Sequence, residues 1–135
     1  SSGAQLVGQL LVAAWDGRDV VKSATFMSGL GDLEPVRLSF RNAALKLSEA
    51  DAAHGSLVKR TPTVRCPLIV AVGERETPDS HRQSGEVAAF WRAQGNRVEH
   101  FTLARRNHFD AVLEWADASS ALFAACRAAM GLQSG

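Results

Sequence analysis

Three side chains have the chemical types and the order of a nucleophile, an acid and a base. Ser1 precedes an expected helix, Glu76 follows an apolar run, and His108 lies further along, in the sequence Arg-Asn-His-Phe-Asp. Hydrolysis of an ester or amide through an acyl intermediate needs a nucleophile, a base that takes its proton and an acid that orients the base. The order serine, acid, histidine therefore predicts a serine hydrolase with these residues as its triad.

The hydrophobic pattern predicts the elements that must position these side chains. Apolar runs indicate strands at Ala24–Met27 and Leu68–Gly73, and alternating residues indicate a third strand at Arg97–Leu103. Apolar residues at helical spacing indicate helices at Gly3–Trp15 and 79–94, the second beginning at Asp79 or Ser80. The other expected segments are a short helix opening at Glu34-Pro35, helices at Ala43–Leu47, Ser48–His54, Phe109–Ala116 and Ser119–Met130, and a loop at Gly55–Pro67.

Strands that alternate with helices, and that are apolar throughout, predict an α/β fold with a parallel sheet covered by helices. A sheet of only three parallel strands would leave a bare hydrophobic edge. The first predicted helix, Gly3–Trp15, also has no strand before it. We therefore expect an upstream segment or a companion chain to supply further strands, with residues 1–135 forming the C-terminal part of a single domain.

The first residues match the second half of the motif G-x-S-x-G, in which the serine lies on a sharp turn between a strand and a helix. Gly3 would let the helix pack against this turn. The N–H of Ser2 would be one of two donors to the oxyanion, and the second donor would come from an upstream loop. A tag remnant also begins with serine and glycine, but the following residues, Ala4–Leu6, favour the catalytic interpretation.

Four stretches of the sequence resemble the kynurenine formamidase (arylformamidase) branch of the α/β-hydrolases. In chain order they are Ser1–Leu6 (SSGAQL), Ser28–Val36 (SGLGDLEPV), Gly73–Ser84 (GERETPDSHRQS) and Asn107–Phe109 (NHF). The block Arg-Gln-Ser at 82–84 is the most specific to this family, whereas the serine and histidine segments would fit any esterase of the fold. The chain is thus similar to the C-terminal half of such an enzyme.

This resemblance implies that Ser1 is the nucleophile, Glu76 the acid and His108 the general base. It also implies an α/β-hydrolase fold, no metal or organic cofactor, and hydrolysis of an aryl formamide such as N-formylkynurenine to formate and an amine. The alternative functions are a general carboxylesterase of small esters and a catalytically inactive interaction module.

The identity of the acid has alternatives. Members of the family typically carry aspartate at this position, so Glu76 is a departure, although the fold accepts either residue. Asp79 lies three residues further on, and Asp32 follows another predicted strand. Arg82 is a weak candidate for binding a substrate carboxylate, and an ion pair with Glu76 or Asp79 is the competing interpretation.

Composition argues against several classes of partner. Fifteen basic and 14 acidic residues leave a formal net charge of +1, which predicts neither a nucleic-acid-binding nor a membrane-binding surface. No apolar run approaches the roughly 20 residues of a membrane span, and the N-terminus lacks the basic region of a signal peptide. Cys66 and Cys126 lack metal-ligand spacing, so we expect free, buried thiols and a cytoplasmic location.

A chain that starts at its nucleophile has three interpretations. A larger precursor could be cut just before Ser1 into two pieces that stay associated, Ser1 could use its own α-amine as base, or the chain could be a fragment. The expected partners are a small formamide or ester substrate and the N-terminal half of the same hydrolase. The sequence leaves open whether two copies form a homodimer.

Overall fold

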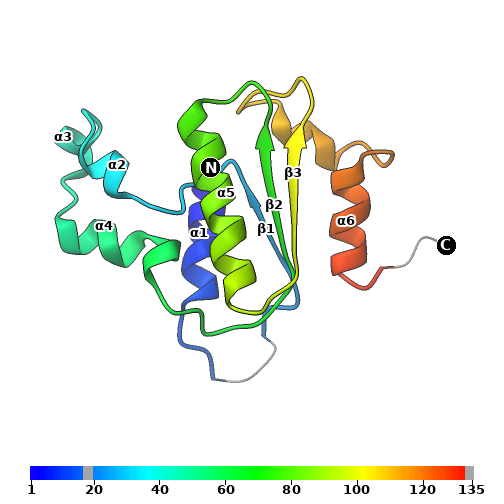
Figure 1. Ribbon diagram of the computed structural model, residues 1–135, viewed down its shortest axis with the longest axis horizontal. Helices are drawn as coiled ribbons and strands as arrows, with labels where there is room; N and C mark the ends of the chain where they lie inside the picture. Colours follow the sequence, from blue (N-terminus) through cyan, green and yellow to red (C-terminus); the bar gives the residue numbers. More distant parts are fainter. Residues whose placement is uncertain (17–19, 133–135) are drawn as a thin grey trace.

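A parallel sheet of three strands forms the centre of the molecule. The strands are β1 (Ala24–Met27), β2 (Leu68–Gly73) and β3 (Val98–Leu103), and they lie in the order β1-β2-β3 (Figure 1). In the register of the sheet, Ala24 pairs with Leu68, and Leu68 pairs with Val98. This computed structural model describes residues 1–16 and 20–132. It confirms the α/β fold with a parallel sheet that the sequence predicts.

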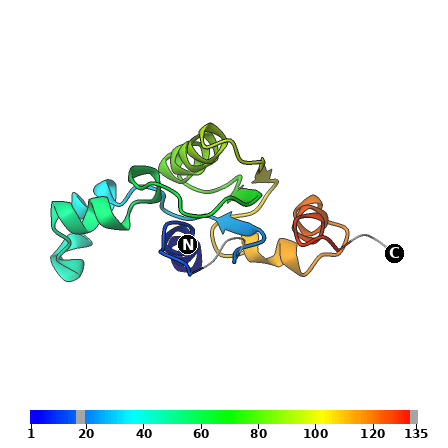
Figure 2. The same cartoon turned by 90° about the horizontal axis from the view of Figure 1, so that it is seen from below.

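Helices surround this sheet. In the described residues they are α1 (Ser2–Leu11), α2 (Glu34–Arg37), α3 (Asn42–Leu45), α4 (Glu49–Gly55), α5 (Pro78–Ala93) and α6 (Ala121–Ala129), with 3₁₀ helices η1 (Leu57–Lys59) and η2 (Ala111–Trp115). Helix α5 covers one face of the sheet and α6 the other (Figure 2). Helices α2, α3 and α4 extend away from the sheet at one side (Figure 1).

Two hydrophobic clusters cover the faces of the sheet, because successive strand residues point to opposite sides. On one face Phe26 and Val70 pack with Trp91 of α5 and with α1. On the other face Ile69 packs with Leu122 of α6. Every residue of β2 is buried, as expected for a strand with helices on both faces.

The predicted strands are confirmed, and β1 and β2 have the predicted bounds, because each is a short apolar run between loop residues. The predicted helix at residues 3–15 is too long. Helix α1 ends at Leu11, whose carbonyl accepts a hydrogen bond from the N–H of Thr63 at 3.1 Å instead of continuing the helix. The helix predicted at 109–116 is shorter in the structure, where it is the 3₁₀ helix η2. The predicted loop at 55–67 contains η1.

Strands β1 and β3 are the edges of the sheet. Within residues 1–16 and 20–132, β1 pairs with β2 alone. Helix α1, which packs beside β1, exposes the apolar side chains of Leu6 and Leu10. Unpaired strand edges and exposed apolar faces are normally covered by further chain. The open β1 edge therefore agrees with the expectation that more strands complete the sheet.

The two cysteines are buried and free, as the sequence predicts. Burial raises the pKa of the Cys66 thiol, so this thiol stays protonated at neutral pH and is a poor nucleophile. None of the helices in the described ranges combines the length and the apolar character needed to cross a bilayer.

Candidate active site

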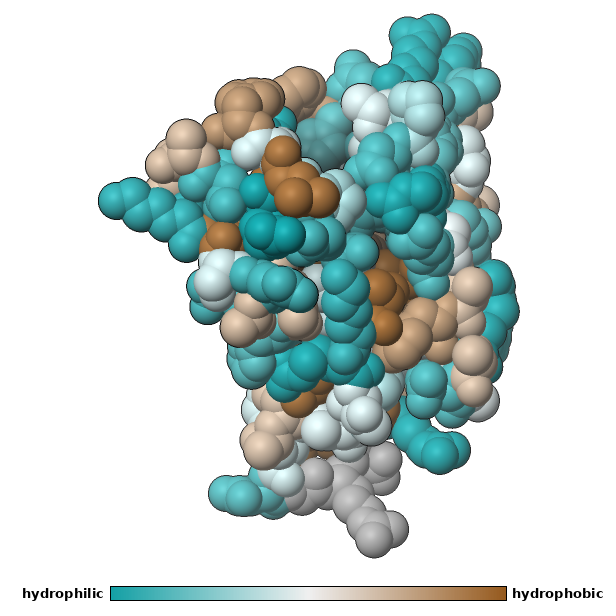
Figure 3. All heavy atoms as spheres, turned by 60° about the vertical axis from the view of Figure 1, so that its left-hand side comes forward, coloured by the Kyte–Doolittle hydropathy of each residue, from teal (hydrophilic) through white to brown (hydrophobic). Residues whose placement is uncertain are grey.

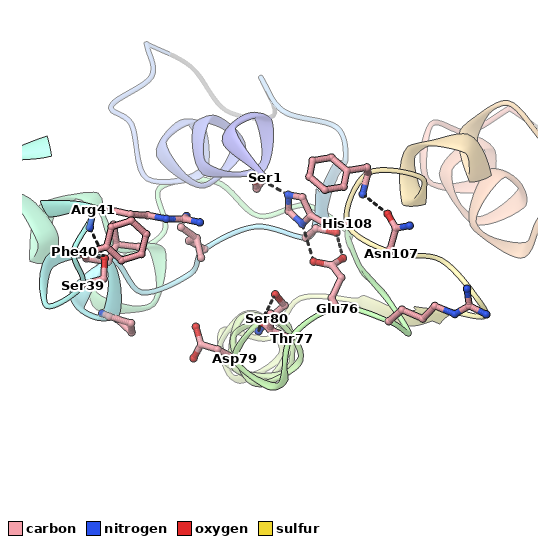
Figure 4. Close-up of a pocket in the computed structure, with 16 residues that line it drawn as sticks. Ser1, Ser39, Phe40, Arg41, Glu76, Thr77, Asp79, Ser80, Asn107 and His108 are labelled. Carbon is pink, nitrogen blue, oxygen red and sulfur yellow. Dashed lines mark hydrogen bonds and ion pairs between the residues drawn. The ribbon is translucent and has the colours of Figure 1, made fainter. Parts of the chain in front are cut away.

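The three predicted catalytic residues meet at the carboxyl end of the sheet. Glu76 follows β2, His108 follows β3, and Ser1 precedes α1. Loops at the carboxyl ends of parallel strands lie at one edge of the sheet and bring distant residues together. Figure 4 shows the imidazole of His108 between Ser1 and Glu76.

A continuous series of hydrogen bonds links these side chains. His108 Nε2 lies 3.2 Å from Ser1 Oγ, and His108 Nδ1 lies 2.8 Å from Glu76 Oε2. With the proton on Nδ1, the imidazole donates to the carboxylate and its Nε2 accepts from the serine hydroxyl. This is the arrangement in which a histidine acts as general base.

The predicted acid is buried, whereas the predicted base is accessible. The side chain of Glu76 is 1% exposed and that of His108 is 39% exposed. Burial by itself raises the pKa of Glu76, but hydrogen bonds from Ser28, His108 and the Gly73 N–H outweigh it, and the pKa lies below its ordinary value of 4.5. Glu76 is therefore ionised at neutral pH and can stabilise the imidazolium form of His108.

Two donors hold the second oxygen of this carboxylate. The backbone N–H of Gly73 donates to Glu76 Oε1 at 2.9 Å, and the hydroxyl of Ser28 donates to the same oxygen at 2.5 Å. Ser28 comes directly after β1 and is buried. It was not among the residues predicted from the sequence. Its place just after a predicted strand, at the edge where loops meet, is the signal that could have identified it.

A glycine allows the loops that carry the acid and the base to touch. A Cβ atom at Gly73 would lie 2.7 Å from the backbone oxygen of Arg106, which is too close for real atoms. The N–H of Arg75 donates to that same oxygen at 2.9 Å. This bond ties the loop after β2 to the loop after β3, two residues before His108.

A hydrogen-bonded turn fixes the position of His108. The side-chain oxygen of Asn107 accepts from the N–H groups of Phe109 at 2.8 Å and of Asp110 at 3.2 Å. The carboxylate of Asp110 accepts from the N–H of Asn107 in return. These bonds close the turn that leads into the 3₁₀ helix η2.

The predicted nucleophile lies at the N-terminus of α1. Ser1 is the N-cap residue, but its side chain makes no capping hydrogen bond and faces His108 instead. Ser2 is the first residue of α1, so its N–H belongs to the four that have no acceptor inside the helix. N–H groups at this end of a helix favour negative charge, which is what the predicted oxyanion role of Ser2 requires.

The rival acids are engaged elsewhere. Asp32 pairs with Lys59 at 2.9 Å, and the carboxylate of Asp79 binds Arg82. No hydrogen bond or ion pair joins either aspartate to His108 in the described part of the chain. Glu76 is the acid that the geometry places beside the base.

Arg82 does not join this group. Its guanidinium pairs with Asp79 and with Glu86 along α5, and it does not line the pocket beside the triad. The neighbouring Gln83 is fully buried and accepts from the N–H of Asp32 at 2.9 Å while donating to Asp79. Gln83 therefore holds α5 against the loop that follows β1.

A pocket of about 650 Å³ opens beside the triad and is lined by Ser1, Glu76, His108 and other side chains. Phe40 and Arg41, from the segment between α2 and α3, form part of its wall, and Phe109 forms another part. Both phenylalanines are largely exposed. The side chain of Arg41 extends toward Ser1 and His108 (Figure 4).

The face that carries α2 to α4 is mostly hydrophilic, with separate hydrophobic patches among the polar side chains (Figure 3). The segment around α3 exposes Leu38, Phe40 and Leu45. In residues 1–16 and 20–132, no group of three histidine, cysteine, aspartate or glutamate side chains is arranged to hold a metal ion.

Sequence comparison relates the chain to kynurenine formamidases. It is 27% identical over 125 residues to a kynurenine formamidase of Danio rerio and 27% identical over 126 residues to one of Salmo salar. Each match covers 87% of this chain and 43% of the relative. The chain therefore spans less than half the length of the curated relatives it matches. No protein-family model matches it.

Structure comparison gives the same fold. A protein from Silicibacter sp., provisionally described as a thioesterase, superposes with a TM-score of 0.73 at 22% identity, over 90% of this chain and 45% of that protein. A thermophilic esterase from Thermogutta terrifontis, solved with propionate bound, superposes with a TM-score of 0.58 at 12% identity, over 100% of this chain and 55% of that protein. At identities this low, the two superpositions establish similarity of fold alone.

Proposed function

The chain is a relative of the kynurenine formamidases and has the fold of the C-terminal part of an α/β-hydrolase, and from this premise we propose that it carries the triad of a serine hydrolase acting on aryl formamides. The observation that carries the proposal is the hydrogen-bonded series Ser1, His108, Glu76. A buried, ionised acid behind an accessible imidazole, with a hydroxyl in front of it, is suited to acyl transfer.

Acylation transfers the formyl group to the enzyme. His108 takes the proton of the Ser1 hydroxyl while Oγ attacks the formyl carbon, and the N–H of Ser2 binds the oxyanion that forms. When the intermediate collapses, the carbon–nitrogen bond breaks and His108 gives its proton to the leaving arylamine. Glu76 keeps the imidazole oriented and stabilises its positive charge. The formyl group is left as an ester on Ser1.

Deacylation returns the enzyme to its starting state. His108 takes a proton from a water molecule, whose oxygen attacks the formyl ester. The ester bond breaks, Ser1 recovers its proton from His108, and formate leaves. One formamide and one water molecule thus give one amine, one formate and one proton, and no redox step is involved.

The lining of the pocket supports an aryl substrate with an anionic substituent. Phe40 and Phe109 offer ring surfaces for stacking. In the described part of the chain, the guanidinium of Arg41 forms no ion pair with an acidic side chain, so its charge is available to a substrate. N-formylkynurenine combines an aryl formamide with a carboxylate and matches these groups.

A carboxylesterase of small esters is the second candidate, because the same triad cleaves esters and a solved structure with this fold is an esterase. Turnover of N-formylkynurenine and of a p-nitrophenyl ester by the protein, expressed from its complete coding sequence, separates the two. We expect kcat/KM to be higher for the formamide and both activities to be lost in Ser1→Ala. Efficient turnover of the ester alone would favour the esterase, and activity that survives Ser1→Ala would contradict both.

A further inference from the structure

Ser28 has an unusual backbone conformation for a residue with a side chain. Its φ is 51°, in the left-handed region that costs energy for residues other than glycine. Its N–H nevertheless donates to the carbonyl of Ala71 at 2.8 Å, so the pairing of β1 with β2 continues to this residue. Such local strain persists only where the surrounding structure enforces it, and it concentrates at functional sites.

The neighbouring packing enforces this conformation. A Cβ atom at Gly29 would lie 2.5 Å from the Cβ of Ala4 and 2.6 Å from ring atoms of Phe26. The turn after β1 is therefore pressed between α1 and the sheet, with no room for a side chain at residue 29. This fixes the direction in which the Ser28 side chain leaves the backbone.

The hydroxyl of Ser28 reaches the acid of the triad. It donates to Glu76 Oε1, while Oε2 of the same carboxylate faces His108 Nδ1. The Glu76 side chain is 1% exposed, so water does not readily replace a missing donor. Without the hydroxyl, Oε1 would keep only the N–H of Gly73, and the carboxylate could rotate away from the imidazole.

We propose that Ser28 is a positioning residue of the triad, whose hydroxyl locks the Glu76 carboxylate in the orientation that holds His108. The role rests on the proposed hydrolase function, and it acts through Glu76 without requiring contact with substrate. The need for this hydroxyl explains why a serine occupies a strained conformation that glycine would fit better.

Two substitutions separate the hydroxyl from the backbone. Ser28→Gly accepts the left-handed conformation but removes the hydroxyl. Ser28→Thr keeps the hydroxyl but is β-branched, and therefore more strained at this φ. Both variants are made in protein expressed from the complete coding sequence. In Ser28→Gly we expect kcat to fall by about tenfold or more, with little change in KM. Losses of this size are typical when a residue that orients a functional side chain is removed. Per folded molecule, Ser28→Thr should keep most of the activity despite a lower Tm.

An NMR signal tests whether Ser28 orients the Glu76–His108 hydrogen bond, without measuring turnover. We expect the proton that His108 Nδ1 shares with Glu76 to give a far-downfield proton NMR resonance in the wild type. We expect it to broaden or shift in Ser28→Gly and to persist in Ser28→Thr. If the wild type shows the Ser28-dependent resonance but no hydrolysis, the proposed function fails while the positioning role stands.

The proposal is overturned if Ser28→Gly is folded and has wild-type kcat and an unchanged resonance, or if the wild type lacks the resonance. Ser28→Ala is the second hydroxyl-free variant and covers the case in which glycine disturbs folding. It should show the same loss of kcat as Ser28→Gly. A purely structural role predicts instead that the variants differ in Tm and share the wild-type kcat.

Discussion

At the scale of single residues, the anchoring of Glu76 explains how a glutamate can serve as the acid. A glutamate carboxylate has one more rotatable bond behind it than an aspartate carboxylate, so it needs more contacts to be held in one orientation. Here Ser28 and the Gly73 N–H hold Oε1, and His108 takes Oε2. The same donors favour the ionised form and lower the pKa of Glu76 against the effect of burial.

The lowered pKa of Glu76 predicts a pH-dependent contribution to stability. A carboxyl whose pKa is lower in the folded state stabilises the fold above its ordinary value of 4.5, and this contribution is lost as the pH falls through the folded value. Glu76→Gln should therefore lower Tm clearly at pH 7, and the difference from the wild type should shrink as the pH is lowered toward 3. Thermal unfolding across this range measures both.

Glu99→Gln is the matched control, because Glu99 pairs with the exposed Arg97 at the other end of β3. Exposed pairs of this kind contribute about 0–1 kcal/mol, so its Tm should stay near that of the wild type at every pH. A Glu76→Gln variant as stable as this control at pH 7 would argue against an ionised, hydrogen-bonded Glu76.

The guanidinium of Arg41 in the pocket wall predicts a preference for anionic substrates. Arg41→Gln should raise KM about tenfold for a carboxylate-bearing formamide, the effect expected when one charged hydrogen bond is lost. It should leave KM for a neutral aryl formamide within about twofold. Steady-state kinetics with the two substrates measures the difference. Arg97→Gln, at the amino end of β3 and remote from the pocket, is the control, and equal KM changes for both substrates would refute the role.

At the scale of elements, the site depends on how closely the loops after β2 and β3 approach each other. Gly73→Ala would place a Cβ atom 2.7 Å from the carbonyl oxygen of Arg106, so the loops must separate. We expect a loss of about 1–3 kcal/mol in the free energy of unfolding and a lower kcat, because Glu76 and His108 move apart. Chemical denaturation and kinetics test this.

Gly85→Ala is the control for this substitution. Gly85 lies inside α5, and a Cβ atom there would meet nothing within 4 Å. Alanine at an exposed helix position stabilises by about 0.5–1 kcal/mol relative to glycine, so this variant should be more stable and fully active. A Gly73→Ala variant that behaves like Gly85→Ala would show that the loop contact is not tight.

The elements also show what the sequence could predict. Strands β1 and β2 were predictable because an apolar run between loop residues is a local signal. The end of α1 was not, since it depends on a hydrogen bond from Thr63, far along the chain. The grouping of Ser1, Glu76 and His108 could be predicted from residue order and resemblance. The contact of Ser28 with Glu76, by contrast, spans 48 residues of sequence. No local pattern encodes a contact of that kind.

At the scale of the whole molecule, one side of the fold is open. Strand β1 has a single partner in the described part of the chain, and the relatives extend well beyond the 43% of their length that the chain matches. The predicted oxyanion donor in the described residues is the N–H of Ser2, and acyl transfer usually uses two such donors. We propose that an upstream segment or a companion chain pairs with β1 and supplies the second donor.

This proposal predicts that residues 1–135 produced alone react slowly. Removal of one oxyanion donor typically costs 10²–10³ in rate, so labelling of Ser1 by a fluorophosphonate should be slower by about this factor than in protein expressed from the complete coding sequence. The two labelling rates, corrected for the folded fraction by circular dichroism, measure the effect. Equal rates would mean that the described residues already form the whole oxyanion site.

The central claim is that Ser1, His108 and Glu76 form a working triad, and identification of the covalently modified residue tests it most directly. The protein is treated with a fluorophosphonate, and the adduct is located by mass spectrometry of its peptides. We predict a single adduct on Ser1, abolished in His108→Ala and slowed in Glu76→Gln, while Glu99→Gln reacts at the wild-type rate. An adduct on another residue, or no adduct on the folded wild-type protein, would contradict the claim.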